Sequence, residues 1–229
     1  MNYIVFKGVK STDIDGLLIS ELPPITKPEM RVEETVINGK DGSQYEDLGF
    51  APYEKPVLIG LRGNYNIDKV MKYFSGEGEV VFSNEPDKVY IAKIFSRIDY
   101  TRLLRFRQAT IPFIVQPYKY KRFEALEHIE TTPAEVYNEG IEPSKPIFTL
   151  KGSGNVAISI NGGYVFEYTF PDGENEVVID SEREEAYLNS DLKNRNMNGE
   201  FPILQSGTNI VQWSGNIESI EVQPRSRWL

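Results

Sequence analysis

The stretch VAISINGGYVFEYTFPDGENEVVID, residues 156–180, constrains the fold most, because two glycine turns divide it into three strand-like runs. Apolar residues alternate with small or polar ones along each run, which is the period of a half-buried strand. Asn161-Gly162-Gly163 and Pro171-Asp172-Gly173 supply residues that accept the backbone angles of tight turns. The pattern predicts a β-meander, a surface that holds other molecules rather than transforming them.

Similar short runs occupy most of the chain, so we expect a mostly β protein. In the second half they are separated by glycine turns, which is typical of a β-sandwich. In the first half they surround one short helix, residues 68–74, which Asn66 can cap. Further strands are expected at residues 3–6, 57–61, 80–83, 90–95, 106–115, 147–151, 209–213 and 217–222.

A change in charge and a cluster of prolines predict a domain boundary. Residues 1–135 carry a net charge of −2 and residues 136–229 carry −7. Pro133, Pro143 and Pro146 lie close together there and cannot support a continuous helix or a central strand. We therefore expect two domains, 1–135 and 136–229, with the last residues of the chain packing back on the first domain.

Composition disfavours several function classes. The net charge of −9 argues against sequence-independent binding to phosphate backbones. The chain has no cysteine, and its single histidine, His128, lies near the predicted boundary, so a Ser-His-Asp site is not expected. No stretch has the roughly 20 apolar residues that span a bilayer. We expect a protein made in the cytoplasm, without enzymatic activity, cofactor, metal or membrane association.

A long hydrophilic hairpin is predicted, with strand-like residues at 32–37 that return antiparallel at 45–48. The sequence Asn38-Gly39-Lys40-Asp41-Gly42 suits a turn with positive φ angles, and strand-like residues flank it on both sides. Charged residues occupy both strands. The hairpin could be an arm that reaches a neighbouring subunit or a solvated edge hairpin, and the sequence leaves both interpretations open.

Two local groups in the second half could bind ligands. Asp180, Glu182, Glu184 and Glu185 could bind Ca²⁺ but lack the spacing of a calcium loop, which favours a solvated acidic turn. Tyr164 and Tyr168 share a predicted strand face with a phenylalanine and could stack on a sugar ring. Packing of that face in the core is the alternative, and it is the favoured one.

Residues 97–122 are locally basic and interleaved with aromatic residues. A nucleic-acid surface is one interpretation. A charge match within the domain or between subunits is favoured, because the acidic hairpin and four other carboxylates are available as partners: Glu77, Glu79, Glu85 and Asp87.

Several separated segments resemble the distal tail protein (Dit) family of bacteriophages with long, non-contractile tails that infect Gram-positive hosts. Together they cover most of the chain in order. They are GLLISELPPITKPEMRVEE (16–34), GKDGSQYEDLGF (39–50), FSNEPDKVY (82–90), IDYTRLLRFRQATIPFIVQPYKY (98–120), YTFPDGENEVVIDSE (168–182), LKNRNMNGEFP (192–202) and PRSRWL (224–229).

The resemblance implies a fold and a role. The fold would be an N-terminal tail-tube-like split β-barrel that closes into a sixfold ring, followed by a C-terminal galectin-like β-sandwich. The role would be a structural hub at the virion tail tip that joins the tail tube to the baseplate and lets the tape measure protein and DNA pass. A carbohydrate-binding module that contributes to cell-wall adsorption is the alternative function.

The resemblance also implies partners: five further copies of the chain, the tail tube protein, the tail-associated spike or lysin protein, the tape measure protein and a receptor-binding protein. A basic lumen would retain DNA, so we expect the cations of residues 97–122 to face protein. The residues expected at the subunit interface are Pro24, Lys27, Glu29, Arg31, Glu33, Glu34, Asn38, Gly39, Arg102, Arg105 and Arg107.

Overall fold

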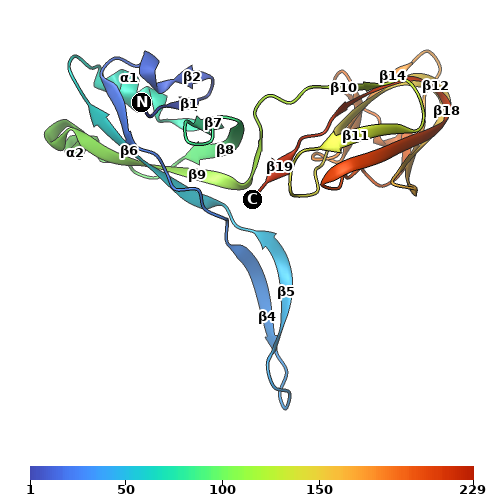
Figure 1. Cartoon of the computed structure of the whole chain (residues 1–229), viewed down its shortest axis with the longest axis horizontal. Coiled ribbons are helices and arrows are strands. Elements are labelled where there is room, and N and C mark those ends of the chain that lie inside the picture. The colour runs from blue at the N-terminus through green and yellow to red at the C-terminus, as the bar shows by residue number, and fades with distance from the viewer. The chain divides into compact units, whose positions relative to one another are not determined.

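The computed structural model describes all 229 residues and divides into two compact units, drawn in Figure 1: Met1–Arg122 with Leu229, and Phe123–Trp228. The sequence predicted the division between residues 135 and 136, whereas residues 123–135 fold with the second unit. Two short strands in this segment explain the difference, because β10 (Glu127–Ile129) and β11 (Ala134–Asn138) both pair with β18 (Gly207–Gln223).

The first unit is built on one curled antiparallel sheet. Its strands lie in the order β2-β1-β7-β8-β9-β6-β3, so the edges of the sheet, β2 and β3, do not pair with each other. The arrangement agrees with the predicted split barrel. The strands are β1 (Ile4–Phe6), β2 (Val9–Lys10), β3 (Leu17–Glu21), β6 (Tyr53–Leu61), β7 (Gly76–Phe82), β8 (Lys88–Ile94) and β9 (Gln108–Lys121).

Phe113 on β9 lies at the centre of the first core. Phe6, Phe74 and Phe82 approach its ring with centroid distances of 5.2, 6.2 and 5.9 Å, each in an edge-to-face arrangement. All four rings are buried. They come from three strands and from the end of the first helix, so this contact fixes the helix against the sheet.

Two short helices accompany the sheet, where the sequence predicted one. The predicted helix is α1 (Ile67–Tyr73), and the side chain of Asn66 caps it by accepting from two backbone amides, as expected. Its buried face includes Val70 and Tyr73, whereas Met71 is exposed. The second helix, α2 (Tyr100–Phe106), was missed; Asp99 caps it and Leu103 anchors it in the core. One turn of 3₁₀ helix lies at Ser11–Asp13.

Two long, bent strands organise the second unit. β12 (Ile147–Ile160) and β18 pair along their length, and the register of the pair shifts near Gly152. A Cβ atom at Gly152 would lie 2.3 Å from the carbonyl oxygen of Asn216, so only glycine fits this crossing. Each strand continues past the bend into a second layer, which is how corner strands connect the two sheets of a sandwich.

The two halves of β12 have different neighbours, and this corrects the predicted meander. Residues 155–160 pair with β13 (Gly163–Thr169), whereas residues 147–151 pair with β14 (Glu176–Asp180). β13 and β14 therefore do not pair with each other. Side chains from both layers form one buried cluster, which agrees with the predicted sandwich. The remaining elements are β15 (Glu185–Leu188), β16 (Asp191–Leu192), a 3₁₀ turn at Asn194–Asn196, β17 (Met197–Gly199) and β19 (Arg227–Trp228).

No helix in the structure has both the length and the apolar character needed to cross a membrane.

Candidate functional site

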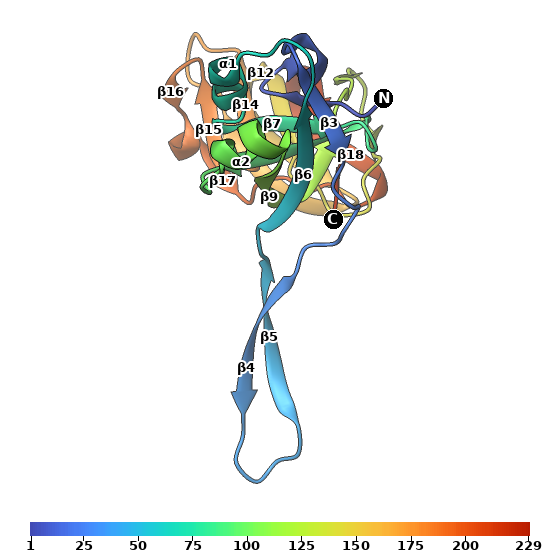
Figure 2. The same cartoon turned by 90° about the vertical axis from the view of Figure 1, so that its left-hand side faces the viewer.

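The predicted hairpin is present and stands apart from the sheet of its own unit (Figure 2). Its strands, β4 (Met30–Val36) and β5 (Ser43–Phe50), pair only with each other. Every residue of β4 is exposed. The turn begins at Asn38-Gly39, and Gly39 has a φ of +82°. Exposed apolar side chains on an isolated hairpin, Val36 at 69% and Tyr45 at 65%, indicate a surface built to contact another molecule.

The two faces of the hairpin differ in chemistry. On one face Glu34 accepts hydrogen bonds from the hydroxyls of Ser43 and Tyr45. On the other face, which we call the acidic face (Glu33, Thr35, Gln44 and Glu46), the register places Glu33 directly opposite Glu46. Neither carboxylate has an ion pair with a cation. Because like charges directly opposite each other destabilise a strand pair, the acidic face lacks its counter-charge within the chain.

One hydrogen bond closes the base of the hairpin, and three further contacts hold the base to the rest of the first unit. The amide of Ala51 donates to the carbonyl of Glu29 at 2.8 Å, and Phe50 packs edge-to-face on Tyr118 at 6.2 Å. The ammonium group of Lys55 and the side-chain amide of Asn84 donate to the carbonyls of Pro24 and Pro23, at 3.0 Å each. The hairpin is therefore anchored at its root and free along its length.

A buried charge cluster (Lys55, Glu85, Tyr90 and Lys119) lies beneath this root. Glu85 accepts from the ammonium of Lys119 at 2.6 Å through Oε1 and from the hydroxyl of Tyr90 at 2.5 Å through Oε2. The side chains of Glu85 and Lys119 are each only 10% exposed. The ammonium of Lys55 lies 4.9 Å from the centre of the Tyr90 ring. The cluster thus holds two cations around one carboxylate inside the first unit.

Burial sets the protonation of these groups. It lowers the pKa of Lys55 from the usual lysine value, although the charge of Glu85 acts in the opposite direction. Burial, and then the charge of Glu85, raises the pKa of Tyr53 to about 12. Burial and the hydrogen bond to Glu85 also raise the pKa of Tyr90. The phenols stay neutral at physiological pH, and Tyr90 can act as a donor to Glu85.

Five of the seven cations in the basic run from Arg97 to Arg122 fall into two groups. Lys119 belongs to the buried charge cluster, which satisfies it within the domain. The other group, Arg97, Arg102, Arg105 and Arg107, lies on and beside α2 and has no carboxylate partner. The carboxylate of Asp99 accepts from the backbone amide of Arg102 at 2.9 Å, as the cap of the helix.

A cavity of about 510 Å³ opens beside α2, and we call it the arginine pocket. It is lined by Leu58, Arg97, Asp99, Arg102, Phe106, Gln108, Ala109 and Thr110. Phe106 is 61% exposed, and the guanidinium of Arg105 lies 5.3 Å from the centre of its ring. Guanidinium groups beside an exposed aromatic ring form a surface that suits carboxylates and planar groups.

The residues predicted for a subunit interface fall into two sets. Those between Pro24 and Gly39 are exposed and belong to the hairpin or to the extended chain that leads to it. Arg102, Arg105 and Arg107 lie at α2 and are also exposed. No hydrogen bond or ion pair joins the two sets within one chain. Within the predicted set, the pairs that the structure does bring together are local, such as Arg31 with the Leu48 carbonyl at 2.7 Å.

Sequence reasoning missed several residues of this region. The buried Lys55 has a detectable signal in the sequence, because it falls at every-second-residue spacing with Tyr53, Val57 and Ile59, which share one face of β6. Glu85 was considered as one of several partners for the basic run, but its pairing with Lys119 was not specified, because Glu85 lies in a turn and the pair spans distant parts of the sequence.

The two tyrosines considered for sugar stacking do not form a shared platform. Tyr168 is fully buried and packs edge-to-face on Phe170 at 5.0 Å, so its ring is not available to a ligand. Tyr164 is 56% exposed and donates to the carbonyl of Asn198 at 3.1 Å. A register shift next to Ser159 separates the two side chains, because it breaks the alternation on which a common face depends.

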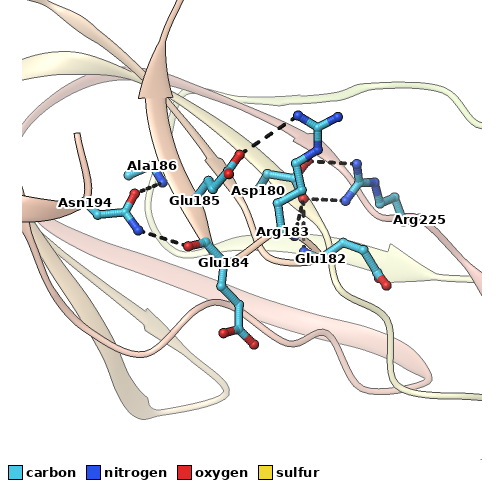
Figure 3. A network of polar contacts seen from close by, with 8 residues as sticks. All are labelled: Asp180, Glu182, Arg183, Glu184, Glu185, Ala186, Asn194 and Arg225. Carbon is cyan, nitrogen blue, oxygen red and sulfur yellow. Dashed lines mark hydrogen bonds and ion pairs between the residues drawn. The ribbon is translucent and has the colours of Figure 1, made fainter. Parts of the chain in front are cut away.

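The acidic turn after β14 is held in place by an ion pair and by hydrogen bonds within the second unit (Figure 3). Arg225 donates to both carboxylate oxygens of Asp180, at 2.6 and 3.1 Å, and the amides of Glu182 and Arg183 donate to Oδ1. Asn194 closes the turn by accepting from the amide of Ala186 and donating to the carbonyl of Glu184. No group of three or more acidic, histidine or cysteine residues is arranged to hold a metal ion.

Stability of the second unit should depend on ionised Asp180. Burial raises the pKa of Asp180, but the Arg225 hydrogen bonds and the backbone donors outweigh it and hold the pKa below the usual value. The contribution is therefore complete above about pH 4 and lost as the pH falls further. Asp180→Asn keeps the turn acceptor but loses the ion pair, so it should cost about 2–3 kcal/mol at pH 7.

Tryptophan fluorescence can follow this effect, because both tryptophans, Trp213 and Trp228, belong to the second unit. Urea unfolding at pH 7 and at pH 3 should show a smaller difference between Asp180→Asn and the parent protein at the lower pH. Asp172→Asn, at an exposed turn, is the matched control. An equal difference at both values would show that the ion pair does not carry the stabilisation.

Comparison with solved structures identifies the fold. The Dit protein of phage SPP1, described as a paradigm of the hub adsorption apparatus in phages that infect Gram-positive bacteria, superimposes with a TM-score of 0.75 over 97% of both chains, at 16% identity. The chain has the Dit fold. A chain of the phage P2 baseplate, in its activated conformation with Ca, also matches, with a TM-score of 0.52 over 97% of both chains at 9% identity. No family model and no curated protein matches the sequence. The match to the SPP1 Dit fold covers both units of the chain, so the resemblance seen in the sequence is confirmed at the level of fold.

Proposed function

We propose that this protein is a structural hub at the tip of a phage tail. Six copies form a ring that joins the tail tube to the baseplate or tip, and the tape measure protein and DNA pass through the ring. The protein connects other proteins through its shape and through two different binding faces of the ring, without enzymatic activity or a cofactor. It is assembled in the host cytoplasm and becomes part of the virion.

The observation that carries this proposal is the full-length Dit fold combined with an anchored hairpin that has no partner in its own chain. A contact between unlike surfaces, repeated by a rotation that closes, generates a ring. The hairpin and α2 supply two unlike surfaces on the same unit. We therefore assign the subunit interface to the first unit, with the residues between Pro24 and Gly39 on one side and Arg102, Arg105 and Arg107 on the other.

The remaining partners follow from the position of a hub. One face of the ring would contact the tail tube protein and the other the tail-associated spike or lysin protein. The second unit would face outward, where a receptor-binding protein can dock. Its buried Tyr168 gives no support to a sugar-stacking platform of Tyr164 and Tyr168.

Labelling of virions tests the location. Antibodies raised against the purified chain should decorate one end of the tail in negative-stain images, at the junction with the tip. A tube-specific antibody, which should label the whole length, is the control. Labelling along the tube, or absence of the chain from purified particles, would contradict the proposal.

A further inference from the structure

We propose that the acidic face of one hairpin docks into the arginine pocket of the next copy in the ring. The proposal rests on the proposed function, because it requires identical copies in a head-to-tail arrangement. It goes further by naming which face of the hairpin is buried, which cavity receives it and which charges meet.

The pocket side of the contact has uncompensated positive charge. Arg97 and Arg102 line the cavity, and Arg105 lies on the same helix, yet none of them has a carboxylate partner. The only carboxylate in the lining, Asp99, is already engaged as the cap of α2. A ligand that brings at least two carboxylates would neutralise the pocket, and guanidinium groups bind carboxylates through two parallel hydrogen bonds.

The hairpin side has the complementary surplus of negative charge. From Glu29 to Phe50 the chain carries six carboxylates and two cations. Glu33 and Glu46 lie opposite each other on one face, so a partner that inserts cations between them removes their repulsion. The other face carries Val32, Val36 and Tyr45 and satisfies Glu34 internally, so its one remaining carboxylate, Asp47 opposite Val32, competes for arginine less than the facing pair Glu33 and Glu46.

Two observations favour a second copy over other anionic partners. The chain as a whole carries a net charge of −9, which disfavours nucleic acid as the occupant, since repulsion from the rest of the surface opposes a phosphate backbone. The hairpin of the same copy is held away by the bonds at its root, including the 3.0 Å contact from Lys55 to Pro24. The occupant is therefore a hairpin from another copy.

The absence of cysteine from the chain permits a clean cross-linking test. Gln44→Cys places a thiol on the acidic face and Gln108→Cys places one in the pocket lining, and neither changes a charge. With a short bismaleimide, the double variant should give a ladder that ends at six linked chains. A mixture of the two single variants should give linked pairs, whereas each single variant alone should stay unlinked. A control with Val36→Cys, on the other face, and Gln108→Cys should link at least tenfold less.

Charge reversal tests the chemistry of the contact. In the cysteine double variant, Glu33→Arg with Glu46→Arg should reduce the linked fraction at least tenfold, and so should Arg102→Glu with Arg105→Glu. Combining the two reversals should restore the linked fraction, because the charges again match. Glu135→Arg with Glu218→Arg, which changes the net charge as the hairpin reversal does but on exposed residues of the second unit, should have no effect.

The outcomes separate this proposal from the proposed function. Sixfold rings without the Gln44–Gln108 cross-link, either in purified protein or in virions, would overturn the docking and leave the hub intact. Linkage only within single chains of the double variant, with no linked pairs in the mixture, would also overturn it. Absence of rings from both purified protein and virions would overturn both proposals.

Discussion

Replacement of Glu85 by glutamine should destabilise the first unit by about 3–5 kcal/mol, the range for breaking a buried ion pair by removal of one partner. Glutamine has nearly the same shape but no charge. The ammonium of Lys119 would then lose its 2.6 Å partner in a site where both side chains are only 10% exposed. Lys55, which already has a lowered pKa because of burial, would lose its nearby counter-charge as well.

Two probes make this prediction specific to one unit. Far-ultraviolet circular dichroism follows the whole chain. In a Trp228→Phe background the only tryptophan is Trp213, which packs against the core of the second unit, so its fluorescence follows that unit. Urea unfolding of Glu85→Gln should show an early loss of β signal while the fluorescence transition stays in place. Glu79→Gln, at an exposed position on β7, is the control. A loss below about 1 kcal/mol, the value typical of surface ion pairs, would show that the cluster does not stabilise the unit.

Removal of the hairpin should abolish ring formation and leave both units folded. Met30 and Phe50 are directly paired, so residues 31–49 can be replaced by Asn-Gly, which forms a two-residue hairpin loop. This variant keeps the root contacts of Phe50 with Tyr118 and of Lys55 with Pro24. Because the proposed interface would lose the hairpin, the shortened chain should stay a monomer under conditions in which the parent forms the proposed hexamer.

Mass measurement and thermal unfolding check both parts of this prediction. The shortened protein should run as a single species with the mass of one chain, and its melting temperature should stay within a few degrees of the parent value. The control is a variant with Lys40→Ser and Asp41→Ser, which changes the tip of the hairpin but keeps its length. Rings formed by the shortened chain would place the interface elsewhere on the first unit.

Local features of the fold were predictable because neighbouring residues determine them. The hairpin follows from Asn38-Gly39 between two strand-like runs, and α1 follows from the cap at Asn66. α2 carried a similar signal in Asp99 and Leu103, but residues 97–122 were interpreted only as a basic run with aromatic residues, and no element was assigned between the strands expected at 90–95 and 106–115. The capping residue Asp99, four residues before the buried Leu103, would have been the better guide there.

Features that depend on distant residues were not predictable. The meander prediction failed because the two halves of β12, on either side of Gly152, pair with different strands. Residues that are adjacent in the sequence do not determine this pairing. The buried charge cluster combines residues from positions 55, 85, 90 and 119, and only the fold brings them together. For the candidate site, the exposed hairpin was visible in the sequence, whereas the arginine pocket required the packing of α2 beside β9.

Counting the copies in the assembled state tests the central claim most directly, namely that identical chains close into a sixfold ring with an open centre. Native mass spectrometry of the purified protein, and of tip complexes released from virions, should give a species of six chains of 26.1 kDa each. Negative-stain averages of the same sample should show sixfold symmetry around a hole. A twofold dimer as the final assembly, or a copy number in mature particles that is incompatible with six, would contradict the account.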